Sequence, residues 1–555
     1  MILPLTLIAF GSFSPQVAAQ SAVHPSGWTD DAAEAAELVE RGKRELFAGK
    51  ERTALGTFEL AHEKSGGALV TESWLLRARI ANGELDEAFE RIVDLESSGA
   101  KAVELDYAIG VARYEFARRT ETEGSGNPGS AYQEAAAYLA DATAAAEGAF
   151  PDAWKMIAAS SRWIGDVETA SRAIDRALEI KRDGETLTLA SKIRIARGAA
   201  YLGEGEKGKG RRALEQGVDD ARAAVKKIGP RKKKAAQLAD VQMQLAVGLL
   251  FLEKKADAAS AYAGAIEWDP TQVDYAQLLN LFTDGDGTVG PFVDVLESGS
   301  AAYRKRWGKA ADQDGVLTWW LGYGEFTLGR HADAVKTFEA ALKKVPEYVN
   351  SYWYIGASNY HRGRSFDAAA AKAFRAYADE DPNGFASMVA SSAENRALPG
   401  RVLGRLYGAG KLELAADLAE VRLVADDSDA TLWNDVGLMS RDAGEKLQKK
   451  RSSKSDRRAK QYFERSWEAY ERAIELDRKP YYLNDGAVIL HYYLKRDSKK
   501  AIALYDEAEK MAEAMLAEGT LSSSEKDLVK IALRDARNNR AALKGRRGRG
   551  ESAGR

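Results

Sequence analysis

Small and aromatic residues recur along this chain in a pattern that is typical of paired amphipathic helices. The clearest stretch covers residues 315–348. Its small, apolar and aromatic positions are Leu321, Gly322, Ala334, Phe338, Ala341 and Pro346. The spacing predicts a first helix whose small residues lie where a second helix crosses it closely, with Phe338 filling the groove between them. Pro346 follows the second helix, because proline cannot continue a helix interior.

The same arrangement recurs between residues 30 and 520. The matching positions include Gly42, Ala54, Phe58 and Ala61; Trp154, Ala158, Ala170 and Ala177; Ala246, Ala258, Tyr262 and Ala265; Gly356, Ala370 and Phe374; and Gly437, Tyr470 and Ala473. The match is weaker, although the pattern stays helical, at residues 100–150, 185–235, 271–314 and 383–400. Repetition in register at so many places is not expected of unrelated helices, so we predict a repeat protein.

This pattern resembles the tetratricopeptide repeat (TPR), a helix-turn-helix unit of 34 residues. The resemblance implies an all-α fold, in which TPR-like helix pairs stack into a right-handed superhelical solenoid with a concave binding face. We expect an N-terminal solenoid over 30–270, an irregular helical junction over 271–314, a C-terminal solenoid over 315–520 with a basic insertion at 446–460, a capping helix over 521–544 and a disordered basic tail over 545–555.

The first residues of the chain have the pattern of an export signal. An apolar run over residues 2–13 is followed by small or β-branched residues at 17–19, as signal peptidase requires. We predict a signal peptide over 1–19, a linker over 20–29, and export to the periplasm or the extracellular space. No basic residue precedes the run, so a buried N-terminal helix or strand is the alternative. The run is shorter than the roughly 20 apolar residues of a membrane span, and we expect no integral membrane span.

Charge is almost balanced over the whole chain. The 80 basic and 83 acidic residues exclude a protein whose entire surface attracts nucleic acid or an anionic membrane. Basic residues nevertheless cluster at 226–234, at 446–460 and in the C-terminal tail. They are either solvated loops or weak contacts for a polyanion, and salt-sensitive binding to nucleic acid or a lipid surface is the alternative function. Aromatic residues do not alternate with the basic ones, so base stacking is not indicated.

Groups that could carry catalysis or bind a metal are few. The chain has no cysteine and its 5 histidines are scattered, which excludes thiol chemistry and thiolate metal sites. Gly203, Gly208 and Lys209 reproduce part of a phosphate-binding loop. However, Gly210 stands where that loop needs Ser or Thr, and a helical pattern precedes it where a strand is required. We predict no enzyme activity, no cofactor and no metal site.

In the TPR family, the residues that face the ligand lie at regular positions of the first helix. Transferred to residues 315–348 and to the unit that follows, these positions give Trp319, Tyr323, Phe326, Asn350, Trp353, Tyr360 and His361. Aromatic side chains contribute much of the energy of protein interfaces, so we predict a groove for a peptide or an extended segment of a protein partner. The alternative is that the rings pack between helices, since a register shift of one residue would turn Trp319 and Trp353 inward. The sequence does not fix the oligomeric state.

One specialised ligand site of the TPR family is not expected here. Some TPR domains grip a C-terminal carboxylate with lysine, asparagine and arginine at fixed first-helix positions. The corresponding positions are Val39 and Lys43 in the first unit, and Trp319 and Tyr323 in the clearest one. The chain departs from that pattern, so we do not expect a receptor for chaperone tails.

Overall fold

The structure, a computed structural model, describes residues 30–308 and 315–552. Every regular element in these ranges is a helix, so the predicted all-α fold is confirmed. Across the described ranges, no helix combines the length and the apolar character needed to cross a membrane. The predicted signal peptide and linker, residues 1–29, lie outside the described residues.

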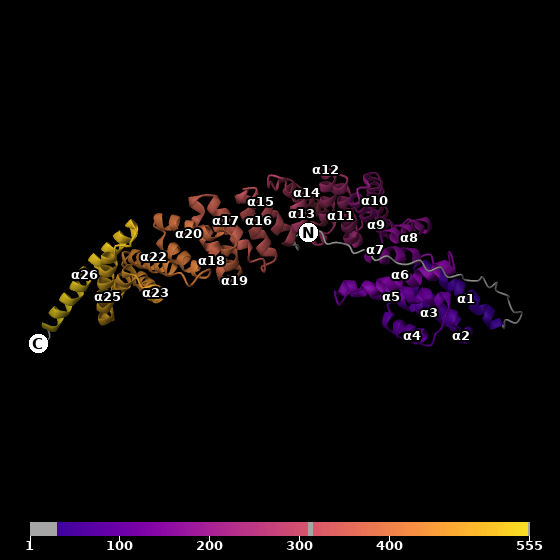
Figure 1. Cartoon of the computed structure of the whole chain (residues 1–555), viewed down its shortest axis with the longest axis horizontal. Helices are drawn as coiled ribbons and strands as arrows, with labels where there is room; N and C mark the ends of the chain where they lie inside the picture. The colour runs from indigo at the N-terminus through magenta and orange to yellow at the C-terminus, as the bar shows by residue number, and fades with distance from the viewer. Residues whose placement is uncertain (1–29, 309–314, 553–555) are drawn as a thin grey trace. The chain divides into compact units, whose positions relative to one another are not determined.

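The helices form two compact units, and α11 (Ala235–Phe251) contributes to both. Unit 1 contains residues 30–229 and 247–254. Its other helices are α1 (Asp30–Phe47), α2 (Glu51–Lys64), α3 (Leu69–Ala81), α4 (Leu85–Ser97), α5 (Val103–Glu123), α6 (Gly129–Ala145), α7 (Ala153–Trp163), α8 (Val167–Ile180), α9 (Gly184–Gly203) and α10 (Lys207–Ile228). Most consecutive helices pack against each other, and the first helices of successive pairs, such as α3 and α5 or α5 and α7, also touch (Figure 1). This is the packing of a helical-repeat solenoid.

Unit 2 contains residues 230–246 and the described residues from 255 onward. Its α-helices are α12 (Lys255–Trp268), α13 (Tyr275–Phe282), α14 (Gly290–Trp307), α15 (Gly315–Thr327), α16 (His331–Lys344), α17 (Ser351–His361), α18 (Asp367–Glu380), α19 (Pro382–Ala390), α20 (Ala393–Gly408), α21 (Leu412–Leu423), α22 (Ala430–Gln448), α23 (Ser453–Leu476), α24 (Pro480–Val488), α25 (Ser498–Glu518) and α26 (Ser523–Ser552). Short 3-10 turns cover Lys232–Lys234, Pro270–Gln272 and Arg364–Phe366, and a π-helix covers Ile489–Leu494. Neighbouring helices again pack in chain order.

Close contacts between a glycine and an aromatic ring hold the predicted helix pairs together. A Cβ atom added to Gly42 would lie 2.6 Å from a ring carbon of Phe58. One added to Gly356 would lie 2.6 Å from the ring of Phe374. Only a glycine lets the two helices approach this far, because any larger side chain would occupy the volume of the ring.

The same close approach appears where the sequence pattern is weak. Within α9, a Cβ atom on Gly198 would lie 2.6 Å from the side chain of Leu214 on α10. Leucine therefore takes the place of the ring in this pair. The substitution explains why the stretch 185–235 forms a regular helix pair although it departs from the repeat pattern.

A partly buried polar network links three successive first helices of unit 1. Arg77 of α3 donates to the hydroxyl of Tyr107 on α5 at 3.1 Å and to Asp152, which directly precedes α7, at 2.8 Å. The Tyr107 hydroxyl donates to the other Asp152 oxygen at 2.6 Å. Burial raises the pKa of Tyr107 well above its usual value, so this hydroxyl remains a donor. A closed network of this kind fixes the stacking of the three pairs.

The structure divides the chain upstream of the predicted junction. The compact units separate near Gly229, and the described part of the stretch 271–314 belongs to unit 2. There α14 packs against α12 as a regular partner, with Gly299 close to Ile266. The stretch therefore adds α13 and α14 to unit 2, and α14 completes a pair with α12.

The C-terminal region differs from the expectation at two places. Only residues 449–452 of the basic stretch 446–460 lie outside a helix, because α22 runs to Gln448 and α23 begins at Ser453. These longer helices carry their own small core of Leu447, Ala459 and Phe463, which stabilises them as an extended hairpin. The predicted capping helix is present as α26, but it continues to Ser552, so most of the predicted tail is helical. Helix propagation from a formed helix is inexpensive, which accounts for the extension.

The glycine contact in the first helix pair gives a direct stability test. Replacing Gly42 with alanine places a methyl group inside the Phe58 ring volume, and overpacking costs about 1–3 kcal/mol. Alanine recovers up to about 1 kcal/mol of helix propensity, so we expect a net loss of about 1 kcal/mol. Chemical denaturation followed by circular dichroism measures it.

Gly56 in α2 provides the matched control. Nothing lies within 4 Å of a Cβ atom added there, so Gly56→Ala gains helix propensity without a clash. We expect it to stabilise the same pair by about 0.5–1 kcal/mol. Equal effects of the two substitutions would contradict the close packing of Gly42 on Phe58.

Candidate functional site

Half-buried aromatic side chains gather on α15 and α17 of unit 2. The ring of Trp319 stacks on Tyr323, with centroids 5.8 Å apart. Tyr354 meets the edges of Tyr323 at 5.7 Å and of Phe326 at 5.3 Å. The indole nitrogen of Trp319 donates to the side-chain oxygen of Asn350 at 3.1 Å. Four of the predicted site residues, Trp319, Tyr323, Phe326 and Asn350, are therefore brought together. Tyr354, which was not predicted, joins them, and we call Trp319, Tyr323, Phe326 and Tyr354 the aromatic surface.

A small hollow opens at one end of the aromatic surface. It has a volume of about 220 Å³ and is lined by Val316, Trp319, Trp320, Tyr348 and Asn350. Its walls are mainly aromatic, and Asn350 supplies a polar group at its rim. Such a hollow suits a single apolar or aromatic side chain from a partner.

Trp353 is not part of this surface, which corrects the sequence prediction. Only 2% of its side chain is exposed, and its ring packs against Phe374 and Phe385. Trp353 lies in the first turn of α17 and faces α18 and α19, which bury it. The next residue, Tyr354, joins the rings of α15 instead, and burial raises its pKa to about 12. The observed register of α17 differs from the predicted one by one residue. Trp353 therefore faces inward, and Tyr354 occupies the position predicted for the tryptophan.

Tyr360 and His361 connect to the aromatic surface through a residue that the sequence pattern did not identify. Phe326 lies 5.7 Å from the ring of His331, the first residue of α16. His331 stacks on His361 at 4.7 Å, and His361 meets Tyr360 edge-on at 5.3 Å. These contacts form an unbroken series of rings from α15 to the end of α17. The signal for His331 was its position at the turn between the helices, beside the predicted Phe326.

The basic stretch 446–460 is only partly available for binding. Arg458 and Lys450 pair with Glu413, and Lys446 donates to the carbonyl oxygen of Gly410. Other cations at the end of the α22–α23 hairpin are exposed and form no ion pair within 4.0 Å among the described residues: Lys449, Arg451, Lys454, Arg457 and Lys460. We call these five the hairpin cations. The stretch 226–234 ends α10 and starts unit 2, and Lys232 lies 4.9 Å over the ring of Trp307.

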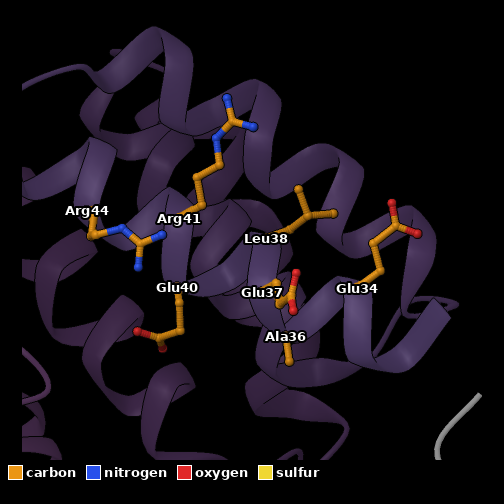
Figure 2. A pocket seen from close by; sticks show the side chains of 7 residues that line it. All are labelled: Glu34, Ala36, Glu37, Leu38, Glu40, Arg41 and Arg44. Atoms are coloured by element: carbon orange, nitrogen blue, oxygen red, sulfur yellow. The ribbon is translucent and has the colours of Figure 1, made fainter. Parts of the chain in front are cut away.

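Another hollow lies on α1 in unit 1 and does not resemble a site. It measures about 640 Å³, and the residues that line it are Glu34, Ala36, Glu37, Leu38, Glu40, Arg41 and Arg44. Figure 2 shows that they all project from one helix. Side chains from a single helix surface do not converge on a ligand. Within the described ranges, no three metal-ligating side chains come together either.

Comparison with known proteins adds little to this geometry. No family model and no curated protein sequence matches the chain. A chain in the structure of Naa15/Naa10 bound to HypK-THB is 15% identical, with a TM-score of 0.28. That match covers 86% of this chain and 63% of the other, so this chain spans less than two thirds of its length. Yeast Tom70 is 14% identical with a TM-score of 0.21, covering 93% and 97%. A chain in the structure of the APC/C hetero-tetramer Cut9-Hcn1 is 13% identical, with a TM-score of 0.25. That match covers 90% of this chain and 97% of the other. These scores are too low to support a functional conclusion.

The stacked histidines give a prediction about acid. Burial first, and then the neighbouring His361, hold the pKa of His331 below its usual 6.5. In acid the unfolded chain therefore binds more protons than the folded chain. The free energy of unfolding is unaffected by this histidine above about pH 6.5 and decreases as the pH falls below that value. The protection factors of the α16 amides, which correct the exchange rates for the intrinsic effect of pH, should fall between about pH 7 and pH 5, and less so in His331→Gln.

A histidine of unit 1 supplies the control for this experiment. His62→Gln removes one imidazole far along the chain in α2 and should leave the acid response of the α16 amides unchanged. An unchanged acid response in His331→Gln would contradict the role of the stacked pair.

Proposed function

We propose that this chain is a non-enzymatic protein-interaction scaffold of the TPR type. Its aromatic surface binds a peptide or an extended segment of a protein partner. The observation that carries the proposal is the group of half-buried rings on α15 and α17, which leaves ring edges and a 220 Å³ hollow at the surface. Rings already held by neighbours lose little conformational freedom on binding, which favours affinity.

The proposed location is the cell envelope. The apolar run and the small residues before residue 20 support export, and the mature chain would begin at residue 20. N-terminal sequencing of the chain recovered from its native cells tests this point.

The hairpin cations support a second candidate function, which is binding to an anionic polymer. Five exposed Lys and Arg side chains at one end of a helical hairpin would attract phosphate groups, and such binding is strongly salt-dependent. Aromatic contacts are not weakened by salt in this way. Salt dependence therefore separates the two candidates.

Affinity capture from an envelope extract tests the proposed function. Residues 20–555 serve as bait, and bound material is eluted with about 0.5 M salt and then with denaturant. We expect a discrete protein in the denaturant fraction. Replacing Tyr323 and Phe326 together with alanine should reduce its recovery more than about tenfold, because rings at an interface contribute a large share of the binding energy.

The control removes exposed apolar side chains from unit 1. Phe116 and Ile164 are 38% and 41% exposed, and replacing both with alanine should leave recovery unchanged. Trp353→Ala is unsuitable, because truncating this buried ring destabilises the fold by about 3–5 kcal/mol. If nucleic acid or lipid released by salt were the only bound material, the proposal would be wrong.

A further inference from the structure

Four cationic side chains line one hollow of unit 2 beyond the aromatic surface. The hollow measures about 780 Å³ and lies among the end of α17, the start of α18, and α20 with the turn that follows it. We call it the basic pocket, and its cations are Arg364, Arg401, Arg405 and Lys411. Clefts lined by charge of one sign concentrate ions of the opposite sign.

Positive charge in the basic pocket exceeds the negative charge that faces it. Asp367 is the acidic residue of the lining, and its Oδ1 atom lies 3.6 Å from Arg405. Glu394 pairs with Arg401 at 2.5 Å. Arg364 and Lys411 form no ion pair within 4.0 Å among the described residues, and both are exposed. Two cations are thus left to attract a ligand.

The other two cations are held in place before any ligand arrives. The guanidinium carbon of Arg405 lies 3.6 Å from the ring centroid of Tyr360, and its Nη1 atom lies 3.6 Å from Oδ1 of Asp367, which is only 2% exposed. Arg401 lies one turn earlier on the same face of α20 and is fixed by Glu394. The planar guanidinium of Arg364, which forms no ion pair among the described residues, suits a ligand carboxylate, because both carboxylate oxygens can accept parallel hydrogen bonds.

The basic pocket adjoins the series of rings. Tyr360 lines the pocket and is also the last ring in the series that starts at Phe326. A single extended segment could therefore place apolar side chains on the aromatic surface and acidic side chains in the pocket.

The surrounding charges favour a peptide over a phosphate polymer. Asp367 lines the pocket beside Arg405, and Glu394 pairs with Arg401. A continuous phosphate backbone would meet these carboxylates as well as the cations, whereas an acidic peptide can place its few carboxylates only where cations stand.

We propose that the basic pocket binds aspartate or glutamate side chains of the partner segment, next to the apolar side chains that contact the rings. This proposal rests on the proposed function and adds the chemistry of the partner: an apolar or aromatic stretch followed by acidic residues. The contact uses side-chain carboxylates and does not need a free C-terminus.

A defined peptide tests this assignment. The probe is a fluorescent peptide with acetylated and amidated ends, in which tyrosines precede a run of glutamates. The comparison peptide carries glutamine at every glutamate position. We expect the glutamate peptide to bind residues 20–555, and its Kd to rise about tenfold in Arg364→Gln with Lys411→Gln. The glutamine peptide should bind the unaltered chain about as weakly as the glutamate peptide binds this variant.

A charge-matched variant controls for net charge. Lys343 and Lys372 are exposed in the same unit, and replacing both with glutamine should leave the Kd unchanged. Equal weakening by the two double variants would overturn the pocket assignment, as would equal binding of the glutamine peptide. Tighter binding of a single-stranded DNA oligomer of the same charge would also overturn it.

Partner capture separates failure of the pocket from failure of the proposed function. If Tyr323→Ala with Phe326→Ala abolishes capture while the pocket variant and the peptide titration show no effect, the scaffold function stands and the pocket assignment falls. If the aromatic variant captures the partner like the unaltered chain, the proposed function itself fails, and the peptide titration then decides the pocket alone.

Discussion

The structure depends on one steric constraint, the close crossing of two helices at a glycine and an aromatic ring. Where Gly42 meets Phe58 and Gly356 meets Phe374, no side chain larger than hydrogen fits on the first helix. The ring then fills the groove and gives each helix pair a fixed geometry. Because no pair can bury its apolar face alone, neighbouring pairs within each unit stack on one another.

This constraint also determines which rings stay near the surface. The ring of the second helix must point into the pair, as Phe338 does beside Gly322. Aromatic residues elsewhere on the first helix are then free to contact the neighbouring pair, as Trp319 and Tyr354 do. The aromatic surface is therefore a consequence of the repeat geometry. Its extension through His331 to Tyr360 brings the rings of α15, α16 and α17 next to the cations of the basic pocket.

The fold could be predicted from the sequence because the close crossing requires particular residue types, glycine on one helix and an aromatic residue on the other. Glycine and aromatic residues at fixed spacing are enough to identify the pairs in the sequence. Sequence reasoning failed where a single position of register matters: Trp353 is buried and Tyr354 takes its place, because the pattern does not distinguish adjacent positions of a helix. The sequence pattern also did not identify Arg401 and Arg405. Both lie on α20, which begins within the stretch 383–400, where the repeat signature is weak. The sequence pattern did not predict the extended α22–α23 hairpin, because its end consists mostly of polar residues and shows little hydrophobic periodicity.

The most direct test of the central claim, that the aromatic surface is the contact site of a protein partner, is photo-crosslinking at a single residue. A benzophenone side chain at Thr327, which is exposed and next to Phe326, should crosslink one discrete partner protein. The same group at Leu60 in unit 1, which is 42% exposed, should not crosslink it. Equal crosslinking from both positions, or none from Thr327 while the partner is bound, would contradict the account.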